Sequence, residues 1–173
     1  SMHKQKTETF VRLIETGKLP LRPGVRRLMQ EVNAKGLILG VCTTSNERAA
    51  QAVAHGILQD IDFAFVLAGD VVKKKKPDPE IYNLALQKSG LKPDECIVIE
   101  DSRNGVVAAA AAGMYIVATT NIYTEKEDLH EADIIVTCLG DPEGEKGELK
   151  QGSPDLAYNG VLSLDQLIDY FST

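Results

Sequence analysis

Short apolar runs rich in β-branched residues alternate with helical patterns along the chain, and this rhythm restricts the fold more than any other feature. The runs occupy residues 37–42, 63–68, 97–99, 115–118 and 134–138. Runs of this length without polar alternation are typical of strands that a parallel sheet buries on both faces. We therefore predict an α/β protein with a Rossmann-like parallel sheet and helices on both of its faces.

The helices between these runs are expected to begin where the sequence supplies a start signal, at Pro23, Thr44, Asp78, Ser102 and Ser163. Proline suits the first turn of a helix, and Ser, Thr and Asp suit its N-cap. Thr44 has Glu47 three positions later, which is the spacing of a capping box. Residues 140–159, with several prolines, glycines and charges, are expected to form a surface loop.

The composition is that of an ordinary soluble globular protein, with 43% hydrophobic and 25% charged residues. A length of 173 residues suits one compact core. The net charge of −6, from 19 basic and 25 acidic residues, argues against a nucleic-acid partner. No apolar run approaches the roughly 20 residues that span a bilayer, so no membrane partner is expected either.

The cysteines Cys42, Cys96 and Cys138 each fall in a run that is predicted to be a buried strand. Their odd number and their apolar surroundings favour reduced thiols in a reducing compartment. We therefore expect a cytoplasmic protein, or one of the plastid stroma if an upstream transit peptide exists.

Three polar clusters follow predicted strands, at the edge where an open parallel sheet binds its ligands. The first cluster is Thr43, Thr44, Ser45 and Asn46, at the start of a predicted helix. Hydroxyl and free backbone N–H groups at a helix N-terminus provide the donors and the positive field that a phosphate requires. The alternative is that these residues only cap the helix.

The second cluster is a run of four lysines at residues 73–76, followed by Pro77. Such a run is usually a solvated surface loop, and three of these lysines are expected to be solvated. Lys76 differs because Pro77 stiffens the chain after it, so that its ammonium group can be held in place as the counter-charge of a phosphate.

The third cluster is the acidic pair Glu100 and Asp101, which stands at the end of a strand before Ser102. Adjacent carboxylates are costly unless they are solvated, paired or bound to a metal. Oxygen ligands of this kind suit Mg²⁺, whose coordination is often completed by substrate phosphate. In the alternative interpretation, Asp101 only stabilises the following helix through the helix dipole.

In their order and spacing the three clusters resemble the motifs of haloacid dehalogenase-like (HAD-like) phosphatases. Five stretches resemble the CbbY-like sugar-bisphosphate phosphatases, relatives of β-phosphoglucomutase: 21–25, 41–47, 68–72, 75–82 and 98–102. The resemblance covers roughly residues 4–140. It implies a Mg²⁺-dependent phosphatase that acts on a phosphorylated sugar through an aspartyl-phosphate intermediate. A pentulose bisphosphate such as xylulose-1,5-bisphosphate is the favoured substrate.

The same resemblance implies a role for each site residue. The residues expected to bind the substrate or its phosphate are Thr43, Thr44, Ser45, Asn46 and Lys76. Of these, Thr43 would hydrogen-bond the transferring phosphoryl group and Lys76 would neutralise its charge, so both are expected to be catalytic. Glu100 and Asp101 would hold Mg²⁺ directly or through water.

One motif of the family is missing from this sequence. Family members begin with a strand that ends in Asp-x-Asp-Gly, whose first Asp is the attacking nucleophile. Residues 1–17 resemble only the last helix of the family's cap domain, so residues 18–173 are expected to be the C-terminal portion of the core domain. We therefore expect the chain to be inactive without an upstream Asp-x-Asp motif.

The missing strand has a structural consequence. In the family it lies between the strands that here end at Thr43 and Glu100, so its loss would leave two buried strand edges unpaired. The edges would be satisfied by a complementing N-terminal fragment, by self-association, or by direct closure of the gap.

Other functions would use the same residues. A sugar phosphate mutase of the β-phosphoglucomutase type is one alternative, and a sugar-phosphate-binding module without catalysis is another. A receiver-like signalling domain also surrounds its phosphorylated Asp with an acidic pair, a hydroxyl and a Lys, but the acidic pair stands too late in this sequence. An upstream Asp-x-Asp-Gly would decide in favour of the enzyme.

Overall fold

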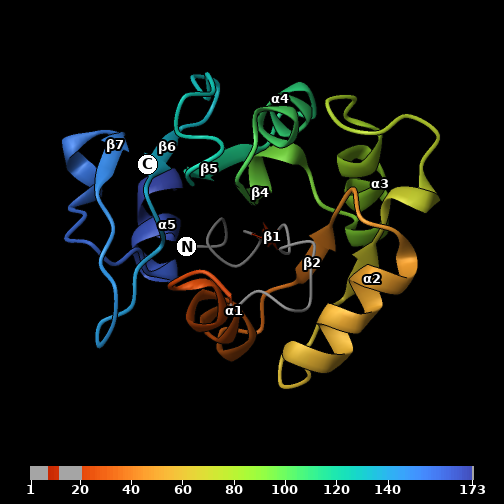
Figure 1. Ribbon diagram of the computed structural model, residues 1–173, viewed down its shortest axis with the longest axis horizontal. Helices are drawn as coiled ribbons and strands as arrows, with labels where there is room; N and C mark the ends of the chain where they lie inside the picture. Colours follow the sequence, from red (N-terminus) through yellow and green to blue (C-terminus); the bar gives the residue numbers. More distant parts are fainter. Residues whose placement is uncertain (1–7, 12–20, 173) are drawn as a thin grey trace.

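The computed structural model describes residues 8–11 and 21–172, and within them the strands form one sheet (Figure 1). The sheet has the strand order β3-β2-β1-β4-β5-β6-β7. Its strands are β1 (Glu8–Val11), β2 (Leu39–Cys42), β3 (Phe65–Leu67), β4 (Cys96–Glu100), β5 (Tyr115–Thr119), β6 (Ile134–Val136) and β7 (Leu149–Gln151). All neighbours pair in parallel except β6 and β7. The predicted α/β fold with a parallel sheet is confirmed.

Helices cover both faces of this sheet. They are α1 (Val25–Ala34), α2 (Glu47–Ala52), α3 (Glu80–Ser89), α4 (Arg103–Ala111) and α5 (Leu164–Phe171), with a π-helical turn at Val53–Ile57 after α2. One hydrophobic cluster holds residues of α1 and α5, and a second holds residues of α3 and α4. Within β4, Ile97 belongs to the first cluster and Val98 to the second, so this strand is apolar on both faces. No helix of the described residues is long and apolar enough to span a membrane.

β1 is an interior strand of the sheet, third in the strand order. It pairs with β2 on one side and β4 on the other, and Val11 is in register with both Val41 and Ile99. The prediction that a strand position separates β2 from β4 is therefore confirmed. The chain's own residues fill that position, so residues 39–41 of β2 and 96–99 of β4 are paired with β1 without a second polypeptide.

Residues 8–11 thus form a strand where the resemblance predicts part of a cap helix. The sheet explains the difference. Between two buried strands, an extended segment can form backbone hydrogen bonds along both of its edges. The remainder of the expected cap segment 1–17, and its boundary with the core domain, lie outside the described residues. That domain division stays a prediction.

Of the predicted helix starts, those of α4 and α5 are confirmed. Ser102 caps α4, and Ser163 forms a capping box with Gln166 at the start of α5. Two others are shifted along the chain, since α1 begins after Gly24 and not at Pro23, and the N-cap of α3 is Pro79 and not Asp78. At α2, however, the cap is Asn46, whose Oδ1 accepts the Ala49 N–H at 2.8 Å. Thr44 therefore stays in the turn before the helix.

The C-terminal region also carries more structure than the expected surface loop. Within residues 140–159, β7 adds an antiparallel edge strand, and the turn Pro154–Leu156 buries the side chain of Leu156. The cysteines agree with expectation, because Cys42, Cys96 and Cys138 are all buried and form no disulfide. Burial raises the pKa of the Cys42 thiol to about 12, which keeps that thiol protonated at neutral pH.

Candidate functional site

Three of the predicted site residues meet at the carboxyl ends of β2 and β4. Lys76 Nζ donates a hydrogen bond to the backbone oxygen of Cys42 at 3.1 Å and forms an ion pair with Glu100 Oε1. Thr43 follows Cys42 directly. The relative exposure is 7% for Lys76, 1% for Glu100 and 1% for Thr43. The fold has thus brought the Lys76 ammonium and the Glu100 carboxylate together below the surface, and buried Thr43 is the next residue after the carbonyl that Lys76 contacts.

Lys76 and Glu100 compensate each other's charge. An ammonium group has three N–H donors, and three contacts account for those of Lys76: the Cys42 carbonyl, Glu100 Oε1 and, at 3.2 Å, Tyr82 Oη. Removing one member of a buried pair lowers the stability of the fold, because the other charge then stays buried without compensation. The sequence suggested solvation, pairing or a metal for Glu100, and the structure supplies a lysine 24 residues away.

Tyr82 is a member of this site that sequence reasoning missed. Its side chain is 1% exposed on α3, and its hydroxyl donates a hydrogen bond to Glu100 Oε1. The centre of its ring lies 4.8 Å from Lys76 Nζ, a distance that suits a cation–π contact. In the sequence, Tyr82 fits the apolar face of a helix, and no local signal shows that its hydroxyl reaches a carboxylate 18 residues later.

Residues 43–46 form the turn that connects β2 to α2. Thr43 Oγ1 accepts the Ser45 N–H at 3.1 Å, and the Ser45 carbonyl accepts the Gly69 N–H at 2.8 Å. Thr44 and Ser45 are partly exposed, whereas Asn46 is exposed and uses its side chain to cap α2. The turn is thereby fixed beside Lys76, and the capping alternative describes Asn46 well.

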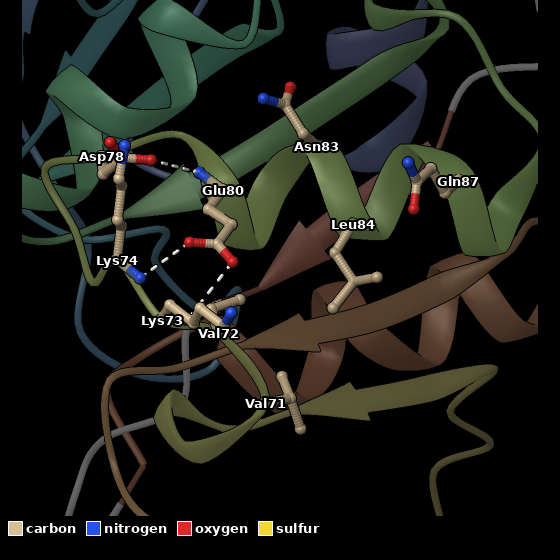
Figure 2. Close-up of a pocket in the computed structure, with 9 residues that line it drawn as sticks. All are labelled: Val71, Val72, Lys73, Lys74, Asp78, Glu80, Asn83, Leu84 and Gln87. Atoms are coloured by element: carbon tan, nitrogen blue, oxygen red, sulfur yellow. Dashed lines mark hydrogen bonds between the residues drawn. The ribbon is translucent and has the colours of Figure 1, made fainter.

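The loop before α3 aims Lys76 inward and leaves its neighbours outside. Glu80 accepts the backbone N–H groups of Lys74 at 2.7 Å and of Lys73 at 3.2 Å, as Figure 2 shows. These hydrogen bonds, that of Lys74 foremost, hold the pKa of Glu80 below its usual value. Lys73 and Lys74 are exposed and line a surface pocket of about 560 Å³. Lys75 is also exposed, but its Nζ donates to the Gly69 carbonyl at 2.7 Å and so braces the loop.

The acidic pair at the end of β4 has the chemistry of a hard-cation site. Asp101 is partly exposed, and its backbone N–H donates to Glu100 Oε2 at 3.3 Å. Gly105 of α4 makes room for the Glu100 carboxylate, because a Cβ at Gly105 would overlap it. Carboxylate oxygens in a partly open cradle fit Mg²⁺, which keeps several water ligands. The described residues contain no group of three or more His, Cys, Asp or Glu side chains that could hold a metal, so further ligands would complete the shell.

Replacement of Gly105 by alanine tests this close packing. We expect Gly105→Ala to lower the unfolding free energy by about 1–3 kcal/mol, because the new methyl group must displace the buried Glu100 carboxylate. Gly56→Ala is the matched control, since Gly56 lies in a helical turn with nothing within 4 Å of the added Cβ. Chemical denaturation would compare the two variants, and equal stabilities would contradict the packing of Glu100 against α4.

Most of the chain is similar in sequence to known hydrolases and CbbY-like proteins. A family described as "Hydrolase: haloacid dehalogenase-like hydrolase" matches residues 3–113. A "CBBY-like protein" of Arabidopsis thaliana is 45% identical over 169 residues, which are 96% of this chain and 51% of the relative. The chain therefore spans about half the length of this curated relative.

Solved structures give the same picture. The crystal structures of CbbY from Rhodobacter sphaeroides, one with phosphate and one of a mutant with xylulose-(1,5)bisphosphate, are 34% identical with a TM-score of 0.66. The alignment covers 72% of this chain and 56% of CbbY. A putative β-phosphoglucomutase from Thermotoga maritima is 35% identical with a TM-score of 0.60, over 66% of this chain and 54% of that protein.

Proposed function

Because the chain belongs to the haloacid dehalogenase-like hydrolases and is similar within them to CbbY-like proteins, we propose that it is the C-terminal part of a Mg²⁺-dependent phosphatase for a phosphorylated sugar. The observation that carries the proposal is the buried Lys76–Glu100 pair, which stands beside Thr43 at the carboxyl edge of the sheet. This edge is where open α/β sheets bind ligands.

Each residue has a proposed task. The Thr43 hydroxyl and the Thr44 backbone N–H would hydrogen-bond the phosphoryl oxygens, and Lys76 would neutralise their charge. Ser45 lies in the same fixed turn and would contact the substrate. Glu100 and Asp101 would hold Mg²⁺, which when bound supplies positive charge to the phosphoryl oxygens. The attacking aspartate of the proposed aspartyl-phosphate route is not among the described residues of this site.

We propose a pentulose bisphosphate such as xylulose-1,5-bisphosphate as the substrate. The support is the complex of Rhodobacter sphaeroides CbbY with that compound, at 34% identity. A sugar phosphate mutase is the second candidate, because the putative β-phosphoglucomutase of Thermotoga maritima is similarly related at 35% identity. A module that binds a sugar phosphate without catalysis is a third, since the residues proposed to bind phosphate and metal all lie in the described part of the chain.

A phosphatase assay on the full-length protein, with purified Asp101→Asn as the test variant, would decide between these candidates. We expect wild-type protein to release phosphate from xylulose-1,5-bisphosphate in the presence of Mg²⁺. Asp101→Asn removes one formal charge at nearly constant shape, so it should weaken Mg²⁺ dependence and activity far more than stability. Because the side chain of Asp101 is partly exposed, its replacement should cost little folding free energy.

The outcomes separate the three candidates. Isomerisation of a hexose phosphate without net release of phosphate would favour the mutase, and binding without turnover would favour the non-catalytic module. An Asp101→Asn variant with unchanged activity and an unchanged Mg²⁺ titration would remove Asp101 from the proposed metal site.

A further inference from the structure

The hydroxyl of Tyr82 lies between the two charges of the site. It donates to Glu100 Oε1, and it accepts a hydrogen bond from Lys76 Nζ at 3.2 Å. Lys76 Nζ and Tyr82 Oη therefore share one carboxylate oxygen of Glu100 and also contact each other. A buried tyrosine hydroxyl usually has one hydrogen-bond partner, whereas the Tyr82 hydroxyl contacts both Lys76 and Glu100, the two members of the ion pair.

The donors of Lys76 explain why this arrangement matters. The contacts to Glu100, Tyr82 and the Cys42 carbonyl account for its three N–H groups. To bind a phosphoryl oxygen, Lys76 must therefore release one of these partners. The partner to give up is one of the two uncharged acceptors, the Tyr82 hydroxyl at 3.2 Å or the Cys42 carbonyl at 3.1 Å, because the contact with the Glu100 carboxylate is strengthened by charge on both sides.

A release of this kind leaves Glu100 with a donor that does not move. When one N–H of Lys76 turns to the phosphoryl group, the Tyr82 hydroxyl still donates to Glu100 Oε1. The carboxylate keeps its orientation, with Oε2 toward the Asp101 backbone N–H at 3.3 Å. Tyr82 is packed in the second hydrophobic cluster, where it is 1% exposed.

We propose that Tyr82 is a positioning residue that holds the Glu100 carboxylate in place for the metal while Lys76 binds the phosphoryl group. The proposal rests on the proposed phosphatase function and adds a residue to its site. Tyr82 touches neither substrate nor metal in this scheme, so its effect is transmitted through Glu100 and Lys76.

Tyr82→Phe in the full-length enzyme is the direct test, because phenylalanine keeps the ring beside Lys76 and removes only the hydroxyl. We expect kcat to fall about 10-fold to 100-fold, the range for loss of one hydrogen bond to a charged group, while KM for the sugar phosphate changes by less than about threefold. The dissociation constant of Mn²⁺, measured by electron paramagnetic resonance without substrate, should rise several-fold. A merely structural role would leave this metal affinity unchanged in the folded protein.

Tyr158→Phe is the matched control. Tyr158 is partly buried, and its hydroxyl donates to the backbone oxygen of Cys138 at 3.2 Å, outside the proposed site. Wild-type kcat and Mn²⁺ affinity in Tyr158→Phe, with both reduced in Tyr82→Phe, would support the proposal. An active wild-type enzyme with an indistinguishable Tyr82→Phe variant would overturn the role of Tyr82 alone. A full-length wild type that neither hydrolyses sugar phosphates nor binds Mn²⁺ would overturn the proposed function and this role with it.

Discussion

The Lys76→Met variant of this chain is expected to lose about 3–5 kcal/mol of unfolding free energy, the range for breaking a buried ion pair by removing one partner. Methionine keeps most of the apolar stem of Lys76, so the loss reports on the charge and its hydrogen bonds. Glu100, at 1% exposure, would remain buried without its ammonium partner. In the full-length enzyme the same change should lower kcat by about 10²-fold or more, as removal of a preorganised group beside a transferring phosphoryl group does.

Chemical denaturation followed by circular dichroism would measure the stability difference. Lys74→Met is the control, because Lys74 is exposed and Glu80 holds its backbone rather than its side chain. Its stability should stay within about 0.5 kcal/mol of wild type. The double variant Lys76→Met/Glu100→Gln should regain part of the loss, since no uncompensated charge remains. Equal stability of Lys76→Met and Lys74→Met would show that the buried pair does not form in solution.

Most of the sheet could be predicted from local patterns, because its strands are buried on both faces. Continuous apolar runs identified β2 to β6, and the serine caps of α4 and α5 were correct. β7 was not predicted, because it is an exposed edge strand and needs no apolar run. β1 was not predicted for a different reason. Glu8–Val11 is half polar, and its strand conformation depends on pairing with β2 and β4, which lie far along the chain.

The site shows the same division between local and distant information. Strand ends and the proline after Lys76 marked the positions of the polar residues, because both are local features. The partner of each charge was not predictable, since the contact between Lys76 and Glu100 joins residues 24 apart on different elements. The site role of Tyr82 was not predictable, because an aromatic residue at an apolar position of a helix is expected to be a core residue.

The roles of Thr43, Lys76, Glu100 and Asp101 therefore remain proposals that rest on geometry and family together. Geometry alone explains Lys76 and Glu100 as a compensated buried pair, which a purely structural role would also need. Asp101 differs from the two members of that pair because it is partly exposed. The Asp101→Asn experiment consequently separates function from stability better than any change to the buried pair.

This chain by itself should show no phosphatase turnover, even with Mg²⁺ and a reactive aryl phosphate such as p-nitrophenyl phosphate. The reason lies in β1, the strand between β2 and β4. β1 carries Glu8 as its acidic residue, and Glu8 is in register with Cys96, at the first position of β4. Glu100 lies four residues further along β4, which at about 3.3 Å per residue places Glu8 roughly 13 Å from the carboxyl edge. The backbone of β1 therefore carries no acidic residue at the carboxyl edge of the sheet.

Phosphate binding should survive where turnover does not, since Thr43, Lys76 and the turn between β2 and α2 all belong to this chain. Calorimetric titration with inorganic phosphate and Mg²⁺ would measure binding, and release of p-nitrophenol would measure turnover, with the full-length protein as the positive control. Turnover by the chain that Asp101→Asn abolishes would show that another residue of this chain attacks the phosphoryl group. The requirement for an upstream aspartate would then be wrong, because β1 would have completed a working site and not merely a sheet.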